Sequence, residues 1–280
     1  MHEHPAGAGG SHEDDEDLVE AIYDALDAGD PAAAADLARG ALEQSKEDDP
    51  VLRLLWGLAL LELDRPDEAV EQVARAVELD PEDAESRANL AVALFRAARF
   101  SEAEREARRA LDADPALPDA HAIWALILER LGRFEEADRH ERTAAERDPE
   151  RFRLPVRIPR TEFESEIRIA GERLPGRFRD LLGEVAVTVE AIPSDEILHE
   201  EQPPLDPELL GLFVGVARGE LGATAGPIAL PPRILLFQRN LERHAADLED
   251  LRSEIAVTLY HELGHYLGLD EQELIQIDLG

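Results

Sequence analysis

The sequence contains no cysteine, one methionine and, among its 29 basic residues, a single lysine. Without thiols the chain can form no disulfide and has no thiolate nucleophile, so only imidazoles and carboxylates are left to hold a metal ion. Basic residues are scarce in general, because 63 acidic residues give a net charge of −34. Nucleic acids and anionic membranes are bound through Lys and Arg, so this balance argues against both and favours a cationic peptide or a basic protein segment as partner.

Long apolar runs and export signals are also missing. The most apolar stretch, Leu54–Leu63, is about half as long as a bilayer-spanning helix and contains Glu62. The N-terminus shows neither a basic n-region nor an apolar h-region, so we expect a cytoplasmic protein. Residues 1–16 are rich in Gly, His and acids, which predicts a disordered tail. Its histidines could bind a metal ion, although a flexible segment supplies no fixed geometry. They are His2, His4 and His12.

From about residue 17 to residue 152 the sequence repeats itself with a period of 34, which Asp-Pro pairs mark most clearly. These pairs begin at Asp80, Asp114 and Asp148, and two rows of alanines keep the same register. The rows are Ala69, Ala103 and Ala137, and Ala76, Ala110 and Ala144. Each unit is typical of two amphipathic helices, in which small residues let the helices approach closely. Large residues occupy the facing positions, at Trp56, Leu90 and Trp124.

This pattern resembles tetratricopeptide repeats (TPR) over about half of the chain. The resemblance implies an all-α solenoid with a concave groove that binds a protein or peptide, but it names no ligand. A solenoid that serves only as a spacer or a dimer surface is the alternative. Residues 153–160 follow with two prolines and three arginines, and they predict a linker. Its arginines either contact an acidic neighbouring domain or are simply solvated.

Residues 161–280 mix helical and strand patterns and predict a second domain. We expect a helix over 161–174 and a short helix from Pro175 to Leu182. Alternation of Val185, Val187 and Val189 predicts a strand, and two further apolar runs are candidate strands. These runs are 210–216 and 233–238. No regular element is expected between the Pro193 turn and Pro207.

A long helix is predicted over 246–267, and it contains the run His-Glu-Leu-Gly-His. A spacing of four residues places His261 and His265 on one helix face, one turn apart, where both imidazoles can hold the same tetrahedral ion. Glu262 lies beside them, where it can take a proton from metal-activated water without being a ligand. The motif is typical of zinc hydrolases.

A third metal ligand must come from elsewhere. The acidic residues that follow the motif are Asp270, Glu271, Glu273 and Asp278. Gly268 can end the helix in a left-handed conformation and turn the chain back towards the metal, which favours Glu271 as the third ligand. Asp270 is the alternative, and Glu271 could instead lie in the first turn of a terminal helix.

Several segments of this region resemble, in the same order, the small bacterial zincin-like metallopeptidases, a minimal matrix-metalloproteinase-like domain. The segments are 174–182, 185–190, 210–215, 232–237 and 260–265. The resemblance covers about 162–280 and implies a compact α+β domain with a short sheet, zinc held by His261 and His265, and Glu262 as general base. Members usually have Asp at the position of Glu271, so the carboxylate here is one methylene further out.

The sequence as a whole predicts an α+β multidomain protein, with a TPR solenoid followed by a small zincin-like domain. Its predicted function is that of an intracellular zinc metalloendopeptidase whose repeats bind the protein or peptide to be cut. The alternative is a non-catalytic TPR adaptor with a structural or vestigial zinc site, although such a site has no use for Glu262. A zinc hydrolase of other amides also fits. Tyr260 and Tyr266 flank the motif, and we expect their rings to pack rather than to stabilise an oxyanion.

Overall fold

The computed structural model describes residues 11–45, 47–218, 231–270 and 273–274. The chain divides into two compact units, Met1–Phe152 and Arg153–Gly280. Across the described residues, none of the helices is both long enough and apolar enough to span a lipid bilayer.

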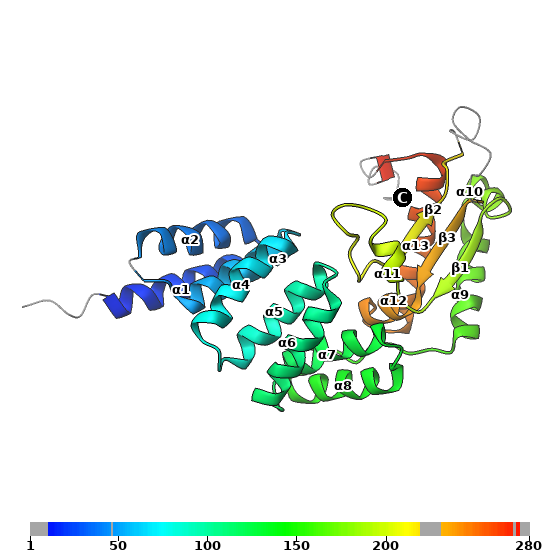
Figure 1. Cartoon of the computed structure of the whole chain (residues 1–280). Coiled ribbons are helices and arrows are strands. Elements are labelled where there is room, and N and C mark those ends of the chain that lie inside the picture. The colour runs from blue at the N-terminus through cyan, green and yellow to red at the C-terminus, as the bar shows by residue number, and fades with distance from the viewer. Residues whose placement is uncertain (1–10, 46, 219–230, 271–272, 275–280) are drawn as a thin grey trace, which may run out of the picture. The chain divides into compact units, whose positions relative to one another are not determined.

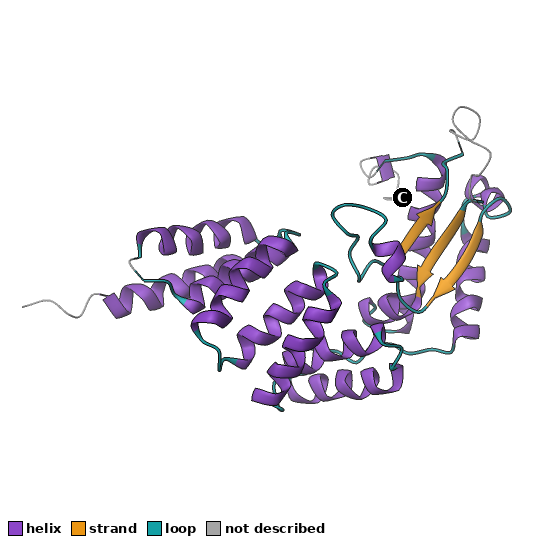
Figure 2. Ribbon diagram, viewed as in Figure 1, coloured by secondary structure: helices purple, strands orange, loops and turns teal. Residues whose placement is uncertain are grey.

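The first unit consists of helices that follow one another as hairpins (Figures 1 and 2). They are α1 (Ser11–Asp27), α2 (Pro31–Gln44), α3 (Pro50–Glu62), α4 (Pro66–Leu79), α5 (Ala84–Arg96), α6 (Phe100–Ala113), α7 (Pro118–Arg130) and α8 (Phe134–Arg147). Helix α1 begins at Ser11, inside the stretch for which the sequence predicts a tail. His2 and His4 lie outside the described residues.

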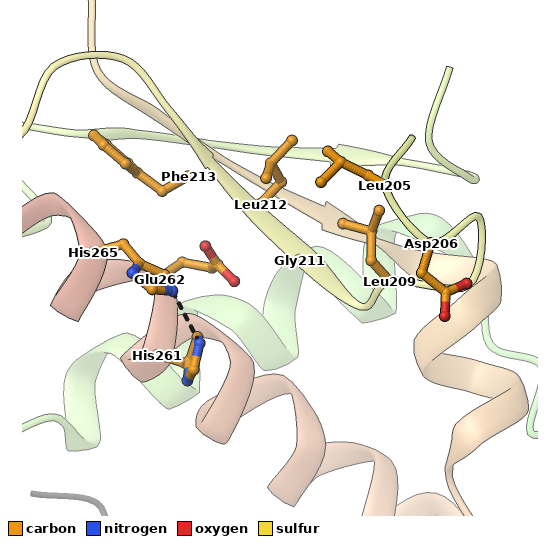
Figure 3. A pocket seen from close by; sticks show the side chains of 9 residues that line it. All are labelled: Leu205, Asp206, Leu209, Gly211, Leu212, Phe213, His261, Glu262 and His265. Carbon is orange, nitrogen blue, oxygen red and sulfur yellow. Dashed lines mark hydrogen bonds between the residues drawn. The ribbon is translucent and has the colours of Figure 1, made fainter. Parts of the chain in front are cut away.

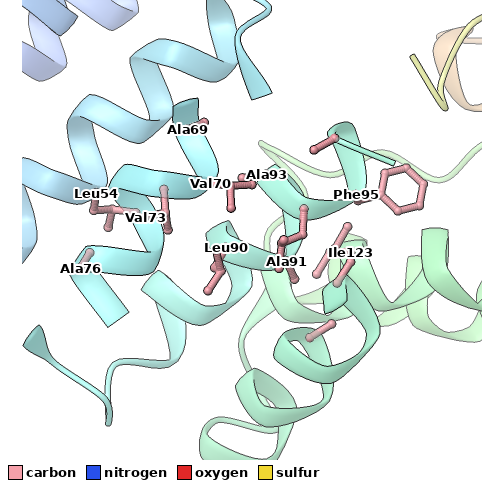
Figure 4. Close-up of a cluster of buried hydrophobic side chains, with 14 of the residues drawn as sticks. Leu54, Ala69, Val70, Val73, Ala76, Leu90, Ala91, Ala93, Phe95 and Ile123 are labelled. Carbon is pink, nitrogen blue, oxygen red and sulfur yellow. The ribbon is translucent and has the colours of Figure 1, made fainter. Parts of the chain in front are cut away.

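Small buried residues lie where the two helices of a hairpin contact each other. Ala69, Ala103 and Ala137 are fully buried, as the repeat pattern predicts. At Gly57 the two helices approach closely, because an added Cβ would lie 2.2 Å from Cγ2 of Val73 on the paired helix. Larger apolar side chains from α3 to α7 fill the space between hairpins (Figure 4). One core cluster thus extends across neighbouring hairpins from α3 to α7, as expected for repeats that cannot bury their apolar faces alone.

The hairpin turns share one backbone geometry. The second residue after the first helix of each pair has a left-handed conformation, at Gly29, Asp64, Ala98 and Gly132. The next amide then donates back across the helix end, as the Arg99 N–H does to the Leu94 carbonyl at 2.8 Å. This arrangement satisfies a carbonyl that the helix leaves without a partner. The same position of the repeat thus forms the turn in all four hairpins.

The second unit contains a three-stranded sheet and helices that pack on it (Figure 2). Its elements are α9 (Arg160–Arg173), α10 (Gly176–Leu181), β1 (Ala186–Glu190), α11 (Asp195–Leu198), β2 (Gly211–Val214), β3 (Arg233–Phe237), α12 (Gln238–His244) and α13 (Leu248–Leu267). The strand order is β1-β3-β2, with β3 parallel to β1 and antiparallel to β2. The predicted strands and helices are confirmed within a few residues. The expectation of no regular element after Pro193 is wrong, because Ser194 caps α11 by accepting the Ile197 N–H.

Both faces of the sheet are covered at β3. Ile234 and Leu236 belong to a core formed with α9, α10 and α13, whereas Leu235 and Phe237 pack on the opposite face beside α11. A strand buried on both faces has an unbroken apolar run, as this one does. The central position of β3 leaves β2 at an edge of the sheet, next to α13.

The segment that leads into α9 is fastened to α12 by one buried carboxylate. Glu242 is 1% exposed, and its Oε2 lies 3.1 Å from Nη1 of Arg157. Its Oε1 accepts the Ile158 N–H at 3.2 Å and the Gln238 Nε2–H at 2.7 Å. Arg157 is therefore bound to the second unit rather than solvated.

Candidate metal centre

Helix α13 presents the His-Glu-Leu-Gly-His run beside the sheet. Asp247 caps its first turn by accepting the Glu249 and Asp250 amides. Gly268 ends the helix with φ of +83°, the left-handed conformation that the sequence predicts there. Four fully buried side chains hold the helix against the core, at Leu251, Ile255, Leu259 and Leu263. The two histidines consequently lie on a different, half-buried side of the helix.

The imidazoles of His261 and His265 converge. Their Nε2 atoms are 3.0 Å apart, close to the separation of about 3.3 Å between two nitrogen ligands of one tetrahedral zinc ion. The Nδ1 atom of His265 lies 3.3 Å from the Leu269 carbonyl oxygen. A carbonyl only accepts hydrogen bonds, so it favours the tautomer with a proton on Nδ1 and an Nε2 lone pair directed at the neighbouring ring. This pair fits two ligands of a metal ion.

Glu262 and the two histidines line a cleft of about 600 Å³ (Figure 3). The remaining lining residues come from β2 and from the segment before it, and they are mostly apolar: Leu205, Asp206, Leu209, Gly211, Leu212 and Phe213. The Glu262 side chain lies beneath β2 in Figure 3, and the residue is only 7% exposed. The site thus combines three polar groups from α13 with apolar walls from distant segments.

Gly211 lets β2 approach α13 at this point. An added Cβ would lie 2.5 Å from Cγ2 of Thr258 and 3.3 Å from Oε1 of Glu262. Sequence reasoning did not single out this residue, although a glycine at the start of a strand can mark a close backbone approach. Its place in the cleft shows that the sheet edge, as well as the helix, shapes the surroundings of Glu262.

Of the two candidates for a third ligand, Asp270 and Glu271, the described residues include only Asp270. Asp270 is exposed and caps the following turn: its Oδ1 accepts the Glu273 N–H at 2.9 Å, while Oε2 of Glu273 accepts the Asp270 N–H at 3.0 Å. Glu271 lies outside the described residues. Within the described part of the chain, no three or more His, Asp or Glu side chains are arranged to hold a metal ion. The structure therefore brings together His261, Glu262 and His265, and the role of Glu271 stays a prediction.

Leu274 holds the terminal turn against α13. It is 3% exposed, and a Cβ on Gly264 would lie 2.1 Å from its Cδ2 atom. The glycine in the middle of the His-Glu-Leu-Gly-His run thus provides the space into which Leu274 packs. This contact holds Leu274 against α13 at Gly264, one residue before His265.

Both tyrosines of the motif pack. The Tyr266 hydroxyl donates to Oε2 of Glu184 at 2.9 Å, and burial together with this acceptor raises the pKa of Tyr266. The Tyr260 ring lies 4.5 Å from that of Phe178, centre to centre. Neither tyrosine is among the described residues that line the cleft.

Two family models match the sequence. The zincin-like metallopeptidase model matches residues 182–280, and the tetratricopeptide repeat model matches 19–84, 54–118 and 89–152. The chain therefore carries N-terminal TPR repeats followed by a zincin-like metallopeptidase domain. The predicted fold class, helical repeats and then a small domain with a short sheet, is confirmed.

Among solved structures, the chain is similar to YrrB, described as a TPR protein with an unusual peptide-binding site. Sequence identity is 22%, the match covers 48% of this chain and 69% of YrrB, and the TM-score is 0.40. MamA is 20% identical over 46% of this chain and 74% of its own, with a TM-score of 0.40. The AMB-1 form of MamA is 26% identical over 47% and 76%, with a TM-score of 0.38. No curated protein sequence matches the chain.

Proposed function

We propose that the second unit is a zinc-dependent peptidase and that the TPR unit binds the protein or peptide to be cut. In this proposal His261, His265 and Glu271 hold the metal, and Glu262 is the general base. The observation that carries it is the pair of Nε2 atoms 3.0 Å apart, in a cleft that also contains the Glu262 side chain. The match to the zincin-like metallopeptidase model supports the same reaction class.

The residues divide the chemistry between them. When bound, zinc would supply a Lewis acid that activates water and polarises a carbonyl group. Glu262 would accept the proton of the attacking water and pass it to the leaving amine. The Leu269 carbonyl keeps His265 in the ligating tautomer. The apolar side chains of Leu212 and Phe213 line the cleft, and a substrate that covered them would exclude water and so strengthen electrostatic interactions at the site.

The position of β2 favours a peptide as substrate over other amides. Among the described strands, β2 pairs only with β3, so its other edge carries backbone groups without a strand partner. An extended peptide can add to such an edge through main-chain hydrogen bonds. Since Gly211, Leu212 and Phe213 line the cleft, a peptide bound along β2 would pass over His261 and His265.

For the TPR unit, charge suggests the kind of partner. The pKa of Glu85 on α5 is raised by burial and by the nearby carboxylates of Asp83 and Asp119. Arg151 already offsets part of this repulsion and pairs with Asp119, and a further cationic segment would offset more of it. With the overall charge of −34, this supports a basic peptide or protein region as the partner.

Metal analysis combined with peptide cleavage tests the catalytic proposal. We expect about one zinc per chain in the purified protein, lost in His261→Ala and retained in Glu262→Gln. Cleavage of a mixed peptide library should fall by about 100-fold or more in Glu262→Gln. Glu271→Ala should lower zinc affinity, whereas the matched control Asp270→Ala should lower it much less, because the Asp270 carboxylate caps the terminal turn.

The outcomes separate the competing functions. Zinc binding without cleavage in the wild type would support a TPR adaptor with a structural metal site. A wild-type protein that binds no zinc would contradict the metal centre. Equal loss of zinc in Glu271→Ala and Asp270→Ala would show that the terminal turn, and not one carboxylate, is what the metal site requires.

A further inference from the structure

The last TPR hairpin is bridged by two histidines. Nδ1 of His121 on α7 lies 2.8 Å from Nδ1 of His140 on α8, and the ring centres are 4.9 Å apart. The other nitrogen of His121, Nε2, lies 3.0 Å from the Pro115 carbonyl oxygen. Since a carbonyl can only accept, His121 carries its proton on Nε2, and the bridge is then an Nδ1–H of His140 donated to Nδ1 of His121.

The same two positions bridge the preceding hairpins with other residues. Thirty-four residues earlier, Nη1 of Arg87 lies 3.0 Å from Oε2 of Glu106, and its Nη2 donates to the Pro81 carbonyl at 2.6 Å. One repeat further back, Arg53 donates to Oε1 of Gln72 at 2.5 Å. Every one of these bridges spans 19 residues and joins the first helix of a hairpin to the second. Of the three, only the last bridge is formed by histidines, the residue type that can change charge near neutral pH.

Protonation affects this bridge in two stages. The four ring nitrogens can carry three protons while one Nδ1 still accepts from the other. A fourth proton places N–H groups on both Nδ1 atoms, so two donors and two positive charges face each other across 2.8 Å. The Arg87–Glu106 bridge contains no imidazole and pairs a donor with an acceptor.

The surrounding charges affect the pH at which both imidazoles of the bridge become protonated. Burial lowers the pKa of His140, and His121, Arg139 and Arg133 lower it further, while Glu136 opposes them. Glu136 is itself held by Arg133, whose Nε and Nη2 lie 2.7 Å and 2.6 Å from its carboxylate oxygens. A histidine whose pKa is lowered by folding binds fewer protons folded than unfolded. The contribution of neutral His140 to the stability of the folded TPR unit is therefore complete above the unfolded pKa of about 6.5. It is lost as the pH falls below that value.

We propose that His121 and His140 form a pH-sensitive latch between α7 and α8, which is closed at neutral pH and opens in mildly acidic solution. The latch acts on the last repeat, because the two preceding hairpins are bridged by side chains other than histidine. Helix α7 also carries Asp119, whose Oδ2 lies 3.1 Å from Nη1 of Arg151 after α8. Opening the latch would therefore loosen the end of the solenoid, whether or not the second unit cleaves peptides.

A swap between repeats tests the latch. The double variant H121R/H140E places the Arg–Glu pair of the preceding repeat at the equivalent positions. Both tryptophans, Trp56 and Trp124, lie in the TPR unit, so their fluorescence reports its thermal unfolding in the full-length protein. Between pH 7.5 and pH 5.5, with a chelator present to exclude metal bridging, the wild-type Tm should fall by about 3 °C more than that of the variant.

The reverse substitution guards against a variant that fails to fold. R87H/E106H adds a second histidine pair one repeat earlier and should increase the loss of Tm on acidification by a similar amount. Equal pH dependence of the wild type and H121R/H140E would overturn the latch. So would an R87H/E106H protein that folds at pH 7.5 and gains no sensitivity to acid.

Discussion

The two units differ in how far apart in the sequence their interacting residues lie. In the TPR unit, bridges between helices join residues 19 positions apart, and Arg99 and Glu102, which pair beside a turn, are three positions apart. In the second unit, Arg157 and Glu242 are 85 positions apart, and Gly211 lies against Glu262. The repeat period of the sequence therefore predicts the contacts of the TPR unit. The long-range contacts of the second unit can be identified only from its folded structure.

The same kind of ion pair also has different surroundings in the two units. The Arg99 and Glu102 side chains are 42% and 41% exposed, and their turn is set by backbone hydrogen bonds. The Glu242 side chain is 2% exposed, and its partner Arg157 is 24% exposed. Exposed ion pairs contribute little to stability. The loss of one partner from a buried network leaves the other polar groups without that partner and without access to water in its place. The two pairs should thus respond very differently to the same mutation.

The largest expected effect is that of Glu242→Ala. It leaves the Ile158 amide, the Gln238 side chain and Arg157 without their shared acceptor, and we expect the second unit to lose about 3 kcal/mol of unfolding free energy. Glu102→Ala, the matched change in an exposed pair, should cost the TPR unit at most about 0.5 kcal/mol. Urea unfolding followed by circular dichroism and by Trp fluorescence separates the two units. Similar losses of unfolding free energy in both variants would contradict the expected difference between the buried and the exposed ion pair.

Glycines offer a smaller contrast within the TPR unit itself. At Gly57 an added methyl would lie 2.2 Å from Val73 Cγ2, so Gly57→Ala should destabilise the unit by about 2 kcal/mol through overpacking. At Gly40, inside α2, nothing lies within 4 Å, and Gly40→Ala should stabilise by about 0.5 kcal/mol through helix propensity. Urea unfolding followed by Trp fluorescence measures both. If Gly57→Ala proves neutral, the hairpins adjust to added volume more readily than a close-packed core would.

Local pattern accounts for most of what could be predicted. The alanine rows follow from the 34-residue period, and the ending of α13 at Gly268 follows from helix-capping chemistry. The position of His261 and His265 on one helix face follows from their spacing of four. The histidine bridge of the last repeat was also open to prediction, since Arg87 and Glu106 occupy the same register. In a repeat protein, a position where one repeat differs in residue type from its neighbours indicates a candidate special site.

The parts that could not be predicted depend on contacts that no local pattern encodes. Leu205, Leu209 and Gly211 reach the cleft because β2 lies beside α13, about 50 residues further along the chain. The short helix α11 was missed because four residues carry almost no periodicity, although Ser194 before Asp195 is a typical cap. The choice between Glu271 and Asp270 depends on the path of the chain after Gly268, which capping chemistry alone does not decide.

The smallest effect concerns the left-handed turn residue of each hairpin. Ala98 has φ of +54° and Gly132, at the same repeat position, has φ of +71°. Left-handed backbone costs alanine about 1 kcal/mol, and glycine loses part of that advantage because its unfolded chain is more flexible. Ala98→Gly should therefore stabilise the TPR unit by about 0.5 kcal/mol. Gly132→Ala, where nothing lies within 4 Å of an added Cβ, should destabilise it by a similar amount. Urea unfolding followed by Trp fluorescence should show opposite shifts, and two shifts of the same sign would mean that the repeats do not share one turn geometry.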